Sequence, residues 1–149
     1  MVTAFAPLAW FIVAWLSLGG LFALLGRAVD GGRRTRDGAL IAASHGCGLF
    51  LAGVSWIYVS LSVFGGMPAA VAALATVLFC LLMSVFPALA GALYVRLAPG
   101  GWLLPRALLF AALWTLAEWL RGWFLTGFPW LAAGYAQTPP SPLAGYAPL

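Results

Sequence analysis

Charge is the scarcest feature of this sequence. Its 149 residues include seven arginines, three acidic residues and no lysine, so 7% of the chain is charged, against about 25% in soluble domains. Residues 38–95 form one uncharged run of 58 residues, more than twice the roughly 20 that a helix needs to cross a bilayer. These features exclude a soluble globular domain, and the 15% aromatic content excludes a disordered chain. The sequence predicts an integral membrane protein.

Cysteine is also rare, and the basic residues are not spread over a surface. Cys47 and Cys80 lie inside uncharged runs without a CxxC partner, so we expect no zinc site, no disulfide framework and no cofactor. Four of the seven arginines fall between positions 27 and 36, a short stretch between two apolar runs. Such a cluster is typical of a membrane topology signal rather than of nucleic-acid binding. We therefore expect no nucleic-acid partner.

The apolar runs predict an all-α membrane protein with about four transmembrane helices in a single domain, 1–149. The expected helices are 8–25, 39–63, 69–95 and 105–123, separated by polar or Gly- and Pro-containing turns. We expect the first run to be a retained span, because no basic segment precedes it as in a signal peptide. The remaining tail, 124–149, holds five of the ten prolines and cannot span as a helix. It is expected to lie on the outer membrane surface.

The arginines orient these helices. The loops 27–38 and 96–106 contain basic residues, whereas the 64–68 turn contains none. Because basic loops are retained in the cytoplasm, the sequence places 27–38 and 96–106 inside. The 64–68 turn and the segment 124–149 then face outward.

Small residues indicate how the helices pack. Ser44, Gly48 and Ala52 recur every four residues in the second helix, as do Ser84, Ala88 and Ala92 in the third. Such stripes favour close helix contacts in lipid, with the lining of a pore or a substrate site as the alternative. His45 lies near the first stripe. An ionisable residue within a membrane span is a functional candidate, although hydrogen-bonded structure is the alternative, and its role stays open.

The densest group of polar and aromatic residues surrounds Glu118, the only glutamate. Arg121 follows three residues later, on the same helix face, so an ion pair is expected. Nearby tryptophans fit an aromatic belt at the membrane interface. One interpretation is a structural ion pair closing a helix end, and the other is an anchoring site for a lipid headgroup or another domain. The candidate anchoring residues are Trp56, Tyr58, Trp114, Glu118, Trp119, Arg121, Trp123, Trp130, Tyr135 and Gln137.

Several of these residues stand in a recognisable order. The run Glu118-Trp-Leu-Arg121-Gly-Trp123, the block Thr126-Gly-Phe-Pro-Trp130 and the sequence Gly134-Tyr-Ala-Gln137 resemble apolipoprotein N-acyltransferase. The segments Ser55–Ser60 and Phe64–Pro68 and the opening Phe5-Ala-Pro7 resemble it too. The resemblance covers nearly the whole chain. It implies a bacterial inner-membrane enzyme that transfers an acyl chain from a phospholipid to the N-terminal diacylglyceryl-cysteine of a lipoprotein.

The resemblance extends to the membrane part of that family and does not include its catalytic domain. The family carries an extracytoplasmic nitrilase-like domain in which a Cys nucleophile, a Glu base and a Lys act through a thioester. This chain has no lysine, and both cysteines are membrane-embedded, where apolar surroundings disfavour the reactive thiolate. No catalytic residue is assigned. We expect the chain to seat membrane phospholipid, to support acylation of a lipoprotein substrate by the missing nitrilase-like domain, and not to catalyse alone.

Three interpretations follow. The chain is an N-terminal piece of the acyltransferase, or a freestanding small membrane subunit that binds lipid or a partner, or a small transporter or channel. The last is disfavoured, because the sequence shows no set of intramembrane charges and no pair of broken helices. A stop codon directly after Leu149 would separate the second interpretation from the first.

The loop asymmetry makes a topology prediction. In intact cells, an impermeant thiol reagent should label a Gly65→Cys variant and leave an Arg34→Cys variant unlabelled, because position 34 lies in a basic loop. Labelling at position 34 together with protection at position 65 would reverse the assignment.

Overall fold

The computed structural model describes residues 1–5, 8, 10–124, 127–137, 141–142 and 144, and this part of the chain is helical without a β-strand. The α-helices are α1 (Phe11–Asp30), α2 (Thr35–Gly53), the one-turn α3 (Trp56–Val59), α4 (Ala69–Leu97) and α5 (Leu103–Trp123). Short helical turns are η1 (Val2–Ala4), the π-helical η2 (Ser60–Phe64) and η3 (Ala133–Ala136). The predicted all-α membrane fold is confirmed.

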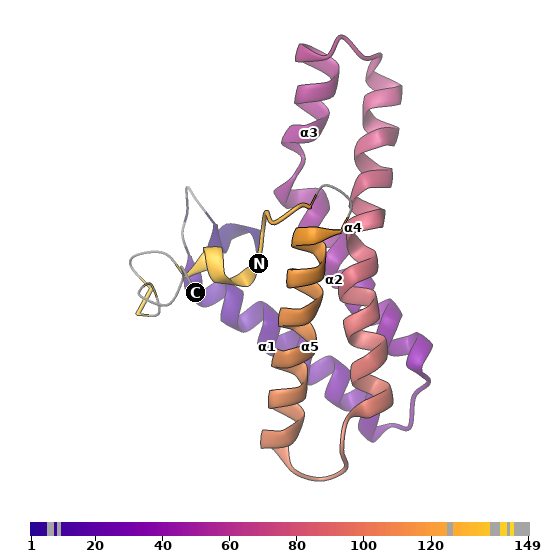
Figure 1. The fold of residues 1–149 in the computed structure, drawn as a ribbon, viewed down its shortest axis with the longest axis vertical. Helices are drawn as coiled ribbons and strands as arrows, with labels where there is room; N and C mark the ends of the chain where they lie inside the picture. The colour runs from indigo at the N-terminus through magenta and orange to yellow at the C-terminus, as the bar shows by residue number, and fades with distance from the viewer. Residues whose placement is uncertain (6–7, 9, 125–126, 138–140, 143, 145–149) are drawn as a thin grey trace.

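Three helices of the described chain are long and apolar enough to cross a membrane: α1, α4 and α5. A fourth candidate is α2 together with α3 and η2, if this bent pair counts as one span. Figure 1 shows α4 as the long central helix, with α3 beside its N-terminal half and α5 beside its C-terminal half. Three to four candidate spans agree with the predicted number.

The predicted continuous helix 39–63 is wrong, because the chain bends by 47° between Gly53 and Trp56. Val54 at the bend is completely buried and packs in a cluster with Phe50, Cys80 and Met83. A uniform apolar run does not reveal such a bend, since either a straight or a broken helix satisfies its hydropathy. The structure therefore contains one broken helix, where the sequence indicated none.

Several helix ends differ from the predicted bounds by two or three residues, and two differ by more. The first helix continues to Asp30 rather than ending at Leu25, and the second begins at Thr35 rather than at Ala39. At the start of α2, the Arg34 backbone N–H donates to the Asp37 carboxylate at 3.2 Å. The prediction ended helices where charge begins, but a carboxylate in the first turn and an arginine in the last turn both stabilise a helix end.

The closest helix contact joins α2 and α4 through residues other than the predicted stripes. Gly38 faces Gly91, and Gly46 faces Pro87, so closely that an added Cβ would collide at each position. The expectation that Ser44, Gly48 and Ala52 form a buried helix contact is wrong, because all three are exposed. In the other stripe, Ser84 is buried, whereas Ala88 and Ala92 are only half-buried. The helix α2 has two faces of small residues, and the spacing alone does not predict which of them packs against α4.

The two basic loops lie at one end of the bundle, which we call the basic end. There Arg106 at the start of α5 forms a salt bridge of 2.8 Å with Asp30 at the end of α1. The Arg106 Nε also donates to the Pro99 carbonyl at 2.8 Å. The turn at 64–68 lies at the opposite end of α4 (Figure 1). This arrangement agrees with loops 27–38 and 96–106 lying on the same side of a membrane.

The α2–α4 contact yields a matched pair of glycine variants. Gly91→Ala should lower the unfolding temperature in detergent, because the new methyl group meets the Gly38 carbonyl and the Ala42 side chain, and such overpacking costs about 1–3 kcal/mol. Gly48→Ala meets no atom within 4 Å and should be neutral or stabilising by up to about 1 kcal/mol. Equal effects of the two substitutions would contradict the observed packing face.

Candidate functional site

After α5 the chain turns back across the bundle. We call Gly127–Gln137 the strap. We call the end of the bundle that it covers the strap end. Gly127 has φ +76° and donates its N–H to the Phe124 carbonyl at 2.9 Å, while the Phe128 N–H donates to the Arg121 carbonyl at 2.9 Å. The positive φ at Gly127 is a backbone conformation that glycine adopts readily. The strap therefore begins with a tight reversal onto the last turn of α5.

The strap combines exposed and packed residues, so the segment expected to lie on the surface also makes contacts with the bundle. Phe128 and Leu131 pack against the buried cluster that includes Phe50 and Val54, and Phe128 meets Phe79 with ring centroids 4.9 Å apart. Ala136 is buried with Ala4 and Ala14. Burial of these three apolar side chains stabilises the packed position of the strap. Thr126 and the tail residues 138–140, 143 and 145–149 lie outside the described residues.

Arg121 holds the first part of the strap. Its side chain is only 3% exposed, and its Nη1 donates to the Phe128 carbonyl at 3.0 Å and to the Trp130 carbonyl. The guanidinium carbon lies 5.1 Å from the Phe50 ring centroid, a cation–π distance. Arg121 thus joins α5 and α2 to two backbone carbonyls that have no helical partner.

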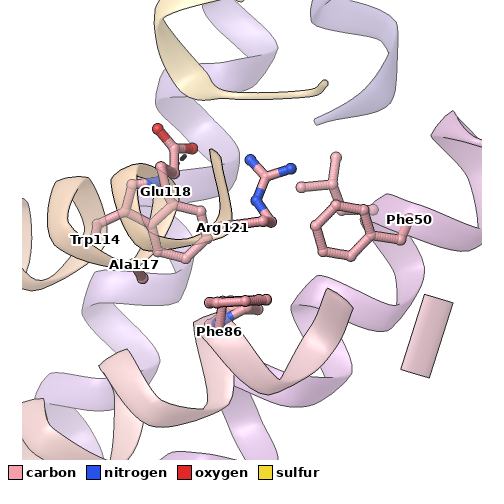
Figure 2. A pocket seen from close by; sticks show the side chains of 8 residues that line it. Phe50, Phe86, Trp114, Ala117, Glu118 and Arg121 are labelled. Carbon is pink, nitrogen blue, oxygen red and sulfur yellow. Dashed lines mark hydrogen bonds between the residues drawn. The ribbon is translucent and has the colours of Figure 1, made fainter. Parts of the chain in front are cut away.

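Glu118 holds the next part of the strap. Its Oε1 accepts hydrogen bonds from the Trp114 Nε1 and from the Ala133 N–H, each at 2.9 Å. Figure 2 shows Glu118 and Arg121 extending side by side from α5, between Trp114 and Phe50. One carboxylate oxygen therefore fixes both the Trp114 indole and the strap backbone.

The predicted Glu118–Arg121 ion pair is wrong. Within the described residues the only contact that meets the 4.0 Å salt-bridge limit joins Arg106 and Asp30. Glu118 and Arg121 share a helix face, as their spacing requires, but each is hydrogen-bonded to a different part of the strap. Backbone groups of an irregular segment compete successfully for both side chains, because these groups would otherwise be unsatisfied in an apolar setting.

The structure brings most of the remaining candidate residues to the same end. Gln137 accepts hydrogen bonds through Oε1 from the Trp15 Nε1 at 3.1 Å and from the Ser141 hydroxyl at 2.8 Å, which ties the strap to α1. His45 packs edge-on against Trp114, with ring centroids 5.8 Å apart. Its Nε2 is buried without a hydrogen-bond partner. His45 therefore lies one ring away from the Glu118 contact.

Three aromatic candidates lie apart from these polar contacts. Trp119 and Trp123 form an exposed pair on α5, with ring centroids 6.3 Å apart. Tyr58 lies on α3 and is 38% exposed. Their exposure fits an aromatic belt at a membrane interface and does not connect them to the strap.

An outward-opening cavity lies between the strap and the bend after α2. Its volume is about 720 Å³, within the range typical of small-molecule sites, about 300–1,000 Å³. The described residues of its wall include no carboxylate, amine or guanidinium side chain, which suits an apolar or weakly polar ligand. Its lining residues are Val2, Phe5, Ala52, Gly53, Trp56, Pro129, Trp130, Leu131 and Tyr135.

Sequence reasoning found three of the four aromatic lining residues, Trp56, Trp130 and Tyr135, but missed the rest of the wall. Val2 and Phe5 lie far from the strap in sequence, and only folding brings them together. Gly53 carried a weak signal, since a glycine within an apolar run marks either a break or a close approach. A second void (Figure 2) measures about 10 Å³, which is at most the room for one water. It is lined by Leu49, Phe50, Phe86, Pro87, Trp114, Ala117, Glu118 and Arg121.

These contacts replace the ion-pair expectation with a different prediction. Arg121→Ala leaves two strap carbonyls without their charged donor and should cost about 1.5–3 kcal/mol. Glu118→Gln keeps a carbonyl oxygen that still accepts from Trp114 and Ala133, so we expect a loss below about 1 kcal/mol. Thermal unfolding in detergent measures both. If Glu118→Gln destabilises as much as Arg121→Ala, the negative charge itself is required and the two side chains act as an ion pair.

Comparison with known proteins gives a consistent result. The whole chain, residues 1–149, matches the family described as the apolipoprotein N-acyltransferase N-terminal domain. It is 49% identical to an apolipoprotein N-acyltransferase of Ralstonia nicotianae and 46% identical to one of Nitrosomonas europaea, over 98% and 99% of this chain. The chain spans only 27% and 29% of these two relatives. With its helical bundle and its Glu118–Gln137 region, the chain belongs to the apolipoprotein N-acyltransferase N-terminal domain family.

Proposed function

We propose that this chain is the membrane part of an apolipoprotein N-acyltransferase, which seats a phospholipid at the strap end and supports a nitrilase-like domain there. At the family level, membership supports a role in lipoprotein maturation. In the proposed reaction an acyl chain passes from the phospholipid to the N-terminal diacylglyceryl-cysteine of a lipoprotein. The chain belongs in the bacterial inner membrane, with loops 27–38 and 96–106 in the cytoplasm and the strap end facing the periplasm.

The observation that carries this proposal is the cavity of about 720 Å³ beneath the strap. Its wall is built from aromatic and aliphatic side chains and opens at the end of the bundle where non-helical backbone gathers. Non-helical backbone is tolerated at membrane depth only where it is satisfied by protein groups or lines a cavity. Arg121 and Glu118 supply that satisfaction to the strap, so the cavity keeps its shape beside the lipid.

The chemistry of the described residues supports binding rather than bond-making. Cys80 is completely buried, and the Glu118 carboxylate accepts from Trp114 and Ala133. A nucleophile needs an adjacent base or an equivalent activating group, and the described cysteines form no hydrogen bond or ion pair with a carboxylate or with His45. The acyl transfer is therefore assigned to the remainder of a full-length enzyme.

A chimera tests this proposal. Residues 1–149 should replace the matching N-terminal part of the Ralstonia nicotianae enzyme and retain acylation of a diacylated lipoprotein, measured by mass spectrometry in phospholipid vesicles. The isolated chain should form neither product nor thioester under the same conditions. In the chimera, Arg121→Ala should lower the acylation rate at a temperature where the protein stays folded, because the cavity wall loses its support.

A matched control uses Gly48→Ala, whose added methyl group meets no atom within 4 Å and which should leave the rate unchanged. A chimera that folds and fails to acylate would contradict the proposed scaffold role. A thioester on Cys47 or Cys80 of the isolated chain would contradict the assignment of acyl transfer to the remainder of a full-length enzyme.

A further inference from the structure

We propose that the strap is a lid over the cavity and that Leu131, pressed against Gly53, is the latch that holds it closed. The strap residues Pro129–Leu131 and Tyr135 form one part of the cavity wall, and the bend residues Gly53 and Trp56 form another part. Closing or opening the cavity therefore changes the distance between the strap and the bend. The latch operates whichever ligand fills the cavity.

Leu131 has a backbone conformation that few side chains adopt. Its φ is +63°, and it is the only non-glycine residue of the described chain with a positive φ. A leucine in the left-handed region is strained, and such strain persists only where the surroundings impose it. Opening the strap would release this strain, so the closed position depends on the contacts that Leu131 and its neighbours make.

The contact that Leu131 makes is with Gly53 at the bend. A Cβ added to Gly53 would collide with the Leu131 Cδ1, and the three nearest atoms it would meet all belong to the Leu131 side chain. Because Gly53 has no side chain, the Leu131 side chain occupies the space that a Cβ at position 53 would fill. The far end of a leucine side chain can yield, so an alanine at position 53 displaces the latch without forcing two backbones apart.

Hydrogen bonds flank the latch on both sides. Arg121 binds the carbonyls of Phe128 and Trp130 just before Leu131, and Glu118 accepts from the Ala133 N–H just after it. Both side chains come from α5, whereas Gly53 belongs to α2. Around Leu131 the strap is consequently held to α5 by polar contacts, whereas the Leu131 side chain makes an apolar contact with α2. The Leu131–Gly53 contact lies at the bend itself and couples the strap to it.

Hydrogen exchange of the protein in phospholipid nanodiscs tests the latch. Gly53→Ala should accelerate amide exchange in residues 128–137 at least about tenfold, because local opening controls the exchange of hydrogen-bonded amides. Exchange in α4 should not change, since the helical core stays packed. Gly48→Ala, on the outer face of the same helix, should have no effect on either segment.

A double variant distinguishes a latch from general loosening. In Leu131→Ala the space beside Gly53 is free, so adding Gly53→Ala should cause no further acceleration, whereas independent effects would multiply. Unchanged exchange in residues 128–137 of Gly53→Ala would overturn the inference, because Leu131 would then simply rotate aside. Equal acceleration in α4 would overturn it too, by showing global destabilisation. Neither outcome depends on whether the chimera acylates lipoprotein.

Discussion

The position of the strap depends on the hydrogen bonds that Arg121 donates to the carbonyls of Phe128 and Trp130. Backbone that leaves a helix at membrane depth carries carbonyls that lipid cannot satisfy. A guanidinium offers several donors in one plane, and its contact with the face of the Phe50 ring stabilises the positive charge. A single side chain can therefore satisfy two carbonyls and join α5 to α2.

Glu118 completes this arrangement from one turn earlier on α5. Because its oxygen accepts from both the Trp114 indole and the Ala133 backbone, it links the aromatic interior to the strap. The interior continues through Phe110, which stacks on Trp114 at a centroid distance of 6.0 Å, to Tyr94. The polar contacts at the strap end thus rest on a continuous aromatic core, and the described lining of the cavity beneath the strap carries no charged side chain.

Glycines decide how closely the other elements approach this end. Gly38, Gly46 and Gly91 let α2 and α4 pack backbone to backbone, whereas Gly53 makes room for Leu131. Gly48 lies on the same helix, but a Cβ added to it would have no atom within 4 Å. Since close packing of small residues stabilises helices in lipid, the buried glycines fix the position of α2 and hence of the bend that forms one cavity wall.

The sequence by itself determined the membrane class, the approximate helices and the grouping of functional candidates. Long uncharged runs have no stable alternative to membrane helices, and a glutamate and an arginine three residues apart must share a helix face. The family resemblance rested on the same region around Glu118 and Trp130, and the comparisons confirm it.

Only the tertiary structure decided which partners those residues take. The strap returns to α5 and offers backbone groups that replace the expected ion pair, and the bend at Val54 breaks a helix that hydropathy left continuous. The small-residue faces of α2 are equivalent in spacing, so only contact with α4 distinguishes Gly38 and Gly46 from Gly48. The physical reason is the same in each case: periodicity fixes the direction of a side chain around its own helix, whereas its partner depends on where the other elements lie.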